Sequence, residues 1–275
     1  MKLKKISIIG VGLMGGSLAL ALKEAYPKSY LWGYARSSRS FKKLKKLKIT
    51  DVVTSDLEKL VSNSDLVILA VPVLTIADYF SRIAPFLKKR AVVIDIGSTK
   101  AFIEKEAKKN LPRYVDFVGS HPLCGSSKHG PENAVAGLYK GSVCIVTSAN
   151  KSVNFVINMW KRLGAKVYVM DPALHDKILS YVSHLPHVIS YSLSLAVPLR
   201  YMPFSSRSFS DITRISSSLP DSWVDIFLSN KKHIVKNIDE YMEILKLFKN
   251  LIKSQDRKAI IRLIRKVNSK HNKFH

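Results

Sequence analysis

Residues 6–17 read ISIIGVGLMGGS, and this stretch decides the fold class. A short apolar run is followed by three glycines with Gly-x-Gly-x-x-Gly spacing and then by an Ala- and Leu-rich segment. The first glycine of such a loop permits a tight turn, the second lets the backbone approach a pyrophosphate, and the third lets helix and strand pack closely. A glycine triplet often serves only a turn, but the strand–loop–helix context predicts a dinucleotide site. Its residues are Gly10, Gly12, Leu13, Met14 and Gly15.

Short β-branched runs alternate with helical stretches through the first part of the chain. Strands are predicted at residues 6–9, 30–34, 65–71, 91–96, 117–118, 143–147 and 166–170, and helices at 17–25, 40–47 and 75–87. The first strands are nearly apolar throughout, which is typical of a parallel sheet buried on both faces. We therefore expect an α/β fold with a Rossmann-type, doubly wound parallel sheet over residues 1–170.

Strand signals stop after residue 170, and the remaining chain is predicted to be an all-helical domain over residues 171–275. A break rich in Pro, Ser and Arg interrupts the pattern at 198–208, and the amphipathic stretch 223–267 must hold more than one helix. Its apolar positions exceed what a small helical domain buries, so we expect a homodimer formed through this domain. They include Ile244, Leu245, Leu247, Phe248, Leu251 and Ile252.

The chain is strongly basic, with 45 Lys and Arg against 20 Asp and Glu, and the excess is spread along the sequence. Such a balance suggests nucleic acid, but no nucleic-acid-binding motif is recognisable, and a positive field also attracts small anions such as a dinucleotide. We therefore expect neither a nucleic-acid partner nor, without an apolar run of 18 residues, a membrane span. Two cysteines indicate no disulfide framework and favour the cytoplasm.

The end of the second strand bears on the choice of cofactor. A carboxylate that would bind the adenine ribose 2′-hydroxyl is missing, because Ala35 stands there. Arg36, Ser37 and Arg39 follow, and guanidinium groups pair well with phosphate oxygens. The sequence thus favours NADP, with NAD possible. The alternative is an exposed basic loop in a basic protein.

His121 lies at the carboxyl end of a predicted strand, in the stretch 116–125, DFVGSHPLCG. Ligands bind at this edge in open α/β sheets, and a histidine can act as a base near pH 7. A single loop histidine is more often structural. Here further motifs follow in the helical domain, SHLPH at 183–187 and DITR at 211–214.

The ordered set of motifs resembles the prephenate/arogenate dehydrogenase family over essentially the whole chain. It comprises the glycine loop, DIGSTK at 95–100, GSHP at 119–122 with Gly125, the motifs at 183–187 and 211–214, and Trp223. The resemblance implies a dimeric oxidoreductase of tyrosine biosynthesis that decarboxylates prephenate oxidatively to 4-hydroxyphenylpyruvate with NAD(P), without a metal.

The resemblance also implies roles for individual residues. His121 is expected to take the proton of the ring hydroxyl, assisted by Ser98. His187 and Arg214 are expected to engage the substrate's side chain and carboxylates, and the Val71-Pro72 turn to lie beneath the nicotinamide. Arg214 has an alternative role as a surface ion pair with Asp211.

Two departures from the family pattern bear on regulation. Ser127 stands where the family commonly has Glu, so gating of the site is expected to differ. The chain starts on its first strand and ends in helix, from which we expect a monofunctional enzyme without a mutase or regulatory domain.

Three alternatives stay open. Arogenate dehydrogenation would give tyrosine directly, although acids that could bind the substrate's ammonium are scarce in the helical domain. A β-hydroxyacid dehydrogenase would need a catalytic lysine, for which Lys177 lacks the expected glycine-rich surroundings. A non-enzymatic, dinucleotide-sensing regulator would not need His121, His187 and Arg214 to converge.

Overall fold

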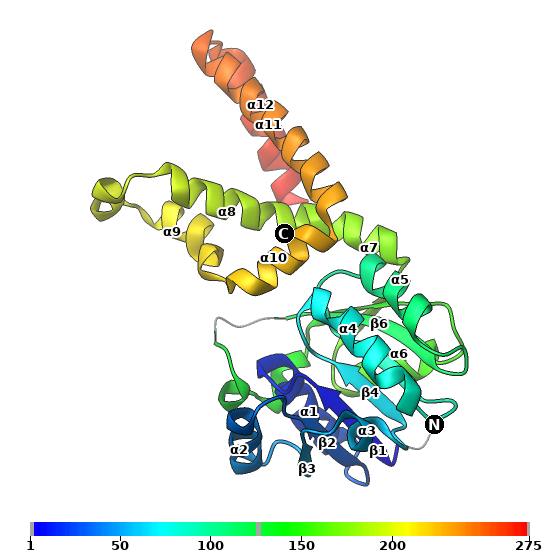
Figure 1. Ribbon diagram of the computed structural model, residues 1–275. Helices are drawn as coiled ribbons and strands as arrows, with labels where there is room; N and C mark the ends of the chain where they lie inside the picture. Colours follow the sequence, from blue (N-terminus) through cyan, green and yellow to red (C-terminus); the bar gives the residue numbers. More distant parts are fainter. Residues whose placement is uncertain (1–2, 125–127, 274–275) are drawn as a thin grey trace. The chain divides into compact units, whose positions relative to one another are not determined.

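The computed structural model describes residues 3–124 and 128–273, in two compact units, Met1–Lys231 and Lys232–His275. The first unit contains a sheet with helices on both faces (Figure 1). Its strands are β1 (Lys5–Ile9), β2 (Tyr30–Tyr34), β3 (Val52–Thr54), β4 (Leu66–Leu69), β5 (Val92–Asp95), β6 (Asp116–Leu123), β7 (Val143–Thr147) and β8 (Lys166–Val169). Its helices are α1 (Leu13–Ala25), α2 (Ser38–Leu47), α3 (Leu57–Val61), α4 (Val73–Ile83), α5 (Ala101–Asn110), α6 (Val153–Arg162), α7 (Pro172–Leu179), α8 (Leu185–Ala196), α9 (Arg207–Thr213) and α10 (Pro220–Ser229).

The strand order in the described residues is β3-β2-β1-β4-β5-β6-β7-β8, which confirms the doubly wound α/β fold. Neighbouring strands are parallel except β6 and β7, which pair antiparallel, so the sheet is mixed and not purely parallel. Strand β3 was not predicted from the sequence. This strand has only three residues, and its register with β2 (Trp32 opposite Val52) follows from the packing of the sheet.

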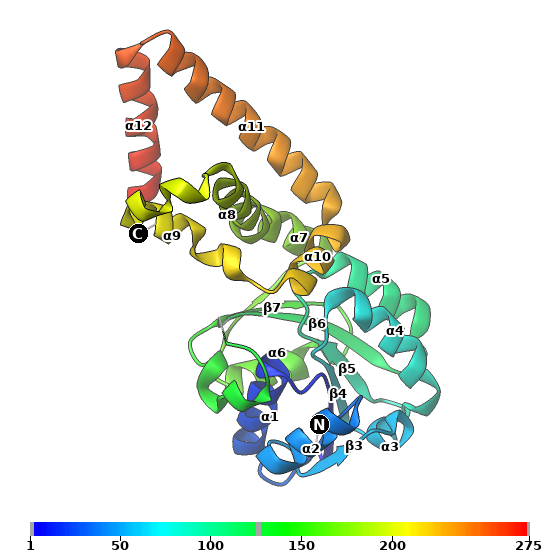
Figure 2. The ribbon, with the colours of Figure 1, turned by 60° about the vertical axis from the view of Figure 1, so that its left-hand side comes forward.

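The central strands are apolar throughout because their successive side chains point to opposite faces of the sheet, and both faces are buried. In β4, Leu66 and Ile68 join one buried cluster, and Val67 and Leu69 join the cluster on the other face. Figure 2 shows the strands between these layers. The first cluster includes residues of α1 and α6, and the second includes residues of α3, α4 and α5. Apolar burial on both faces is the main stabilising contribution to such a sheet.

The glycine loop packs against the turn that follows β4. Gly10 has φ +96°, and a Cβ there would lie 2.3 Å from the carbonyl oxygen of Ala70. A Cβ on Gly15 would lie 2.1 Å from the carbonyl oxygen of Gly10. A Cβ on Gly12 would meet nothing within 4 Å. Two of the glycines are therefore required by packing, whereas the third leaves the N-terminus of α1 open to a ligand.

Helices α7 to α10 belong to the first unit. Asp171 caps α7 by accepting hydrogen bonds from the backbone N–H groups of Ala173 and Leu174. A π-helical turn, Ser180–His184, joins α7 to α8, near Pro186, which has no N–H to continue the ladder. The predicted domain boundary at residues 170 and 171 coincides with the start of α7 and stays a prediction, since the compact units divide after Lys231.

Helix α10 is joined to the carboxyl edge of the sheet by hydrogen bonds from its middle and from its last residue. Asp225 accepts from the backbone N–H of Leu74 (2.9 Å), at the start of α4. The hydroxyls of Ser229 and Thr99 lie 2.9 Å apart. These bonds hold α10 at the carboxyl ends of β4 and β5, the same edge of the sheet at which the glycine loop lies.

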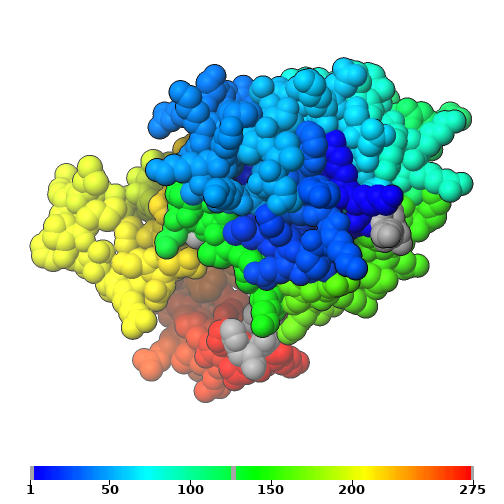
Figure 3. Space-filling view, turned by 90° about the horizontal axis from the view of Figure 1, so that it is seen from below, coloured from blue at the N-terminus to red at the C-terminus, as the bar shows by residue number. Residues whose placement is uncertain are grey.

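The second unit consists of most of α11 (Lys231–Lys253) and of α12 (Arg257–Asn272), so the predicted stretch of more than one helix comprises α10, α11 and α12. Ile244, Leu245, Leu247 and Ile252 on α11 are exposed in the single chain. No described helix is both long and apolar enough to cross a bilayer. Figure 3 shows the face of the first unit on which α1 and α2 lie beside residues 131–139.

Candidate active site

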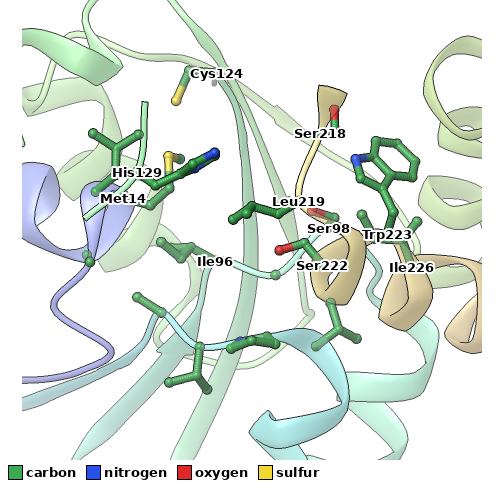
Figure 4. Close-up of a pocket in the computed structure, with 18 of the residues that line it drawn as sticks. Met14, Ile96, Ser98, Cys124, His129, Ser218, Leu219, Ser222, Trp223 and Ile226 are labelled. Carbon is green, nitrogen blue, oxygen red and sulfur yellow. The ribbon is translucent and has the colours of Figure 1, made fainter. Parts of the chain in front are cut away.

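A cavity of about 800 Å³ lies at the carboxyl edge of the sheet, where the glycine loop, the end of β4, the end of β5 and β6 meet. Residues 214–226 close it from the helical side (Figure 4). Gly12, Leu13, Met14 and Gly15 line it together with Val71, Pro72, Ser98, His121 and Arg214. The structure therefore brings together residues that the sequence analysis assigned to the cofactor, to the base and to the substrate.

His121 lies within β6 and not at its end as the sequence analysis expected, because the strand extends to Leu123. The parallel pairing of β6 with β5 stops at Gly119, so His121 follows directly beyond it. Its Nδ1 lies 2.9 Å from Nε2 of His175. Burial, together with His175, Lys100 and His184, lowers the pKa of His121 well below the usual histidine value of 6.5. A neutral imidazole can accept a proton.

Ser98 and Arg214 reach the same cavity from opposite sides. Ser98 follows β5 and lines the cavity together with Leu219 and Ser222 (Figure 4). Arg214 begins the 3₁₀ turn Arg214–Ser217 and is exposed. The alternative ion pair of Arg214 with Asp211 does not occur among the described residues, and a carboxylate oxygen of Asp211 instead lies 4.0 Å from Nε of Arg207.

A buried ion pair supports the strand that carries His121. Lys100 and Asp95 are both fully buried, and the Lys100 ammonium donates to a carboxylate oxygen of Asp95. The same ammonium donates to the carbonyl of Ser120 (2.9 Å), the residue before His121. A buried ammonium needs such partners, because an unpaired buried charge is very costly.

His187 does not line this cavity among the described residues. Its ring stacks on Trp223, with centroids 3.4 Å apart, and its Nδ1 lies 3.0 Å from the carbonyl oxygen of Ser183. Trp223, in turn, lines the cavity. Burial lowers the pKa of His187, which favours its neutral form. The predicted role of His187 at the substrate stays a prediction.

A second cavity of about 800 Å³ lies on the other side of the glycine loop. Gly12, Val71 and Pro72 line both cavities. Arg36 and Ser37 line the second, and Lys43 of α2 joins them there. Ser37 also caps α2, where its hydroxyl accepts from the backbone N–H of Ser40. Arg39 lines neither cavity.

The first cavity is basic. Lys128, His129 and Arg214 line it, and no Asp or Glu is among its described lining residues. Cys124 also lines it, and burial raises the pKa of this thiol to about 11, so the thiol is protonated at neutral pH. No cluster of three His, Cys, Asp or Glu that could hold a metal ion occurs in residues 3–124 and 128–273. Gly125 and Ser127, named in the motif analysis, lie outside the described residues.

His175 and Asp176 were not predicted from the sequence. His175 is fully buried on α7, and its Nδ1 lies 2.8 Å from a carboxylate oxygen of Asp176. The two residues are adjacent in the sequence and begin four residues after the helix cap Asp171, which was the available signal. Their proximity to His121, 54 residues away, depends on the fold.

Two family models match the chain: "Prephenate dehydrogenase, nucleotide-binding domain" over residues 18–169 and "Prephenate dehydrogenase, dimerization domain" over residues 171–266. Cyclohexadienyl dehydrogenase of Zymomonas mobilis is 34% identical, over 92% of this chain and 90% of that protein. Prephenate dehydrogenase of Bacillus subtilis is 31% identical, over 94% of this chain and 72% of that protein.

Solved structures give the same result. The prephenate dehydrogenase from Aquifex aeolicus in complex with hydroxyphenyl propionate and NAD⁺ superposes with a TM-score of 0.91 at 31% identity, covering 100% of this chain and 99% of that one. The arogenate dehydrogenase of Synechocystis superposes with a TM-score of 0.83 at 25% identity, covering 98% of this chain and 100% of that one.

Proposed function

Because this chain belongs to the prephenate dehydrogenase family, we propose that it catalyses the NAD(P)-dependent oxidative decarboxylation of prephenate to 4-hydroxyphenylpyruvate. The observation that carries the proposal is the single cavity that Ser98, His121, Arg214 and the glycine loop line together. The reaction belongs to tyrosine biosynthesis. A cytoplasmic location remains a prediction from the two free cysteines.

The glycine loop fits a dinucleotide. The open space over Gly12 and the N-terminus of α1 suit a pyrophosphate, since backbone N–H groups and the helix dipole attract anions there. The two cavities that meet at Gly12, Val71 and Pro72 suit the two halves of such a ligand. When bound, the dinucleotide supplies the hydride acceptor.

We infer that NADP is preferred over NAD. Arg36 and Lys43 line the second cavity and provide cations for a 2′-phosphate, whereas Ala35 provides no carboxylate for a 2′-hydroxyl. The Lys43 ammonium lies 2.7 Å from a carboxylate oxygen of Glu132, so a phosphate would compete with Glu132 for this ammonium. Arg39 contributes less in this arrangement, because it lines neither cavity.

His121 serves as the general base that takes the proton of the substrate's ring hydroxyl. Its Nδ1 contacts His175, which leaves Nε2 for the substrate. Ser98 lines the same cavity and would orient that hydroxyl by a hydrogen bond. Loss of carbon dioxide then makes the ring aromatic, because the electron pair of the broken carbon–carbon bond moves to the ring oxygen. That oxygen takes back the proton held by His121 and becomes the product's 4-hydroxyl.

Prephenate carries two carboxylates, and the first cavity offers cations for them. Arg214 lines this cavity and would form a charge-assisted hydrogen bond with one of them, and Lys128 adds to the positive field. We infer that prephenate is preferred over arogenate, because no carboxylate among the described lining residues could receive arogenate's ammonium.

The exposed apolar residues of α11 support a homodimer. Exposed apolar faces of this kind mark interaction surfaces, and the matching family model carries the description of a dimerization domain. Light scattering at micromolar concentration should give about twice the chain's 30.9 kDa mass. A monomer would contradict this proposal.

Steady-state kinetics over the four combinations of prephenate or arogenate with NADP⁺ or NAD⁺ tests the function and both preferences. We expect the largest kcat/KM for prephenate with NADP⁺ at low salt, and a smaller cofactor preference as salt screens the cations. No turnover in any combination would overturn the proposed function, whereas equal values for both cofactors would overturn only the NADP preference.

A further inference from the structure

We propose that His175 and Asp176 are positioning residues that fix the tautomer of His121, so that Nδ1 carries the proton and Nε2 is the basic nitrogen. The inference rests on the proposed function, in which His121 is the base. It concerns three buried side chains in a row, from β6 to α7, with contacts of 2.9 Å and 2.8 Å.

Asp176 is the fixed end of this row. Its two carboxylate oxygens accept from the backbone N–H groups of Lys100 (2.7 Å) and Ala101 (3.0 Å), at the start of α5. Burial alone would raise the pKa of Asp176, but the hydrogen bonds from His175 and these amides lower it. The carboxylate is therefore ionised and can only accept hydrogen bonds. Nδ1 of His175 must then donate to it.

His175 passes this constraint on to His121. Burial is the largest effect on the pKa of His175 and lowers it, so the ring is neutral and holds one proton. That proton is on Nδ1, which makes Nε2 of His175 an acceptor. Nδ1 of His121, 2.9 Å away, must donate to this acceptor. In a neutral His121 the lone pair is then on Nε2.

The size of the effect follows from the cost of a wrong tautomer. A base whose proton is on the reacting nitrogen cannot accept another there, and loss of the orienting carboxylate in serine proteases lowers kcat about 10⁴-fold with the geometry intact. In this chain His175 lies between the carboxylate of Asp176 and the base His121, so the carboxylate acts on the base through two hydrogen bonds and not one.

Nitrogen-15 NMR of the full chain, labelled at histidine and free of substrate, tests the tautomer directly. Signals of His121 are assigned by their loss in His121→Asn. We expect a protonated Nδ1 and an unprotonated Nε2 at pH 7.5. A protonated Nε2 would overturn the proposal. Because this measurement does not depend on turnover, its failure is distinct from a failure of the proposed reaction.

Two variants of His175 separate positioning from mere packing. In His175→Gln the side-chain carbonyl can accept from Nδ1 of His121, whereas His175→Leu has similar bulk but no acceptor. We expect kcat with prephenate to stay within about tenfold for Gln and to fall roughly 10²–10⁴-fold for Leu, the range of a lost general base. The KM for prephenate and the Kd for NADP⁺ should change less than about threefold in both variants, because residue 175 lines neither cavity.

Equal losses of kcat in two folded variants would overturn the proposal, since a structural role does not distinguish an acceptor from an apolar side chain. Thermal unfolding of both variants shows whether they fold. If His175→Leu does not fold, the tautomer of His121 in the wild-type chain and in His175→Gln still decides the question, because only an acceptor at residue 175 keeps the proton on Nδ1.

Discussion

Alanine substitutions at Gly12 and Gly15 should have opposite consequences, although both residues belong to one loop. At Gly15 the added methyl would lie 2.1 Å from the carbonyl oxygen of Gly10 and 2.9 Å from the Cβ of Ala70. Neither neighbour can rotate away, so the backbone must shift. At Gly12 the methyl would meet nothing within 4 Å, and the backbone has φ −94°, which ordinary residues adopt.

The expected magnitudes follow from these contacts. Overpacking typically costs 1–3 kcal/mol, and a contact with backbone belongs at the upper end, so Gly15→Ala should lower the free energy of unfolding by about 2–3 kcal/mol. Gly12→Ala should change it by less than about 1 kcal/mol, the scale of a helix-cap exchange. The Gly12 methyl should instead raise the Kd for NADP⁺ at least about tenfold, because it occupies space where the backbone would approach a pyrophosphate.

Urea denaturation without cofactor measures the first quantity, and calorimetric titration with NADP⁺ measures the second. Each variant is the control for the other. Wild-type NADP⁺ affinity in a stable Gly12→Ala protein would refute the assignment of this loop to the pyrophosphate. Wild-type stability of Gly15→Ala would refute the packing argument.

Four further predictions address the base, the substrate, the cofactor and acid stability. His121→Asn should lower kcat roughly 10²–10⁴-fold with NADP⁺ affinity retained, and near-wild-type turnover would remove His121 from the role of base. Arg214→Ala should raise the KM for prephenate about tenfold or more, since a charged hydrogen bond contributes about 1.5–3 kcal/mol. It should leave the Kd for NADP⁺ unchanged, and an unaltered KM would contradict the contact of Arg214 with a substrate carboxylate. Arg36→Ala should weaken NADP⁺ more than NAD⁺ in titrations, whereas Arg39→Ala, the matched control, should have little effect; equal effects would contradict the placement. Burial lowers the pKa of His184 from 6.5 to about 4, so this residue binds more protons in the unfolded chain between these pH values. As pH drops through them, the contribution of His184 to stability should fall by about 3 kcal/mol, and urea titrations of His184→Asn should show a loss smaller than that of the wild type by about this amount.

The secondary structure of the sheet was largely predictable, because it depends on local patterns. Apolar runs such as 66–69 and 92–94 are buried on both faces, so they stand out in the sequence. The glycine spacing of residues 10–15 likewise encodes a turn and a close approach of backbone. The three-residue strand β3 escaped prediction, since it is too short to have a period of its own.

The direction of β7 could not be predicted from its residues. An apolar strand has the same composition in either direction, and only the chain's path from β6 makes this pair antiparallel. This pairing also positions His121. Strand β6 extends beyond its parallel pairing with β5, and His121 lies in the part of β6 that pairs antiparallel with β7.

The type of fold, the dinucleotide loop and the candidate base could all be predicted from the residues, since each depends on one short window of the chain. The contact of His175 with His121, the place of Arg36 and not Arg39 at the second cavity, and the stacking of His187 on Trp223, which lines the first cavity, were visible only in the structure. These relations join residues far apart in the chain, and hydrophobic burial of the sheet and helices, not any local pattern, sets their distances.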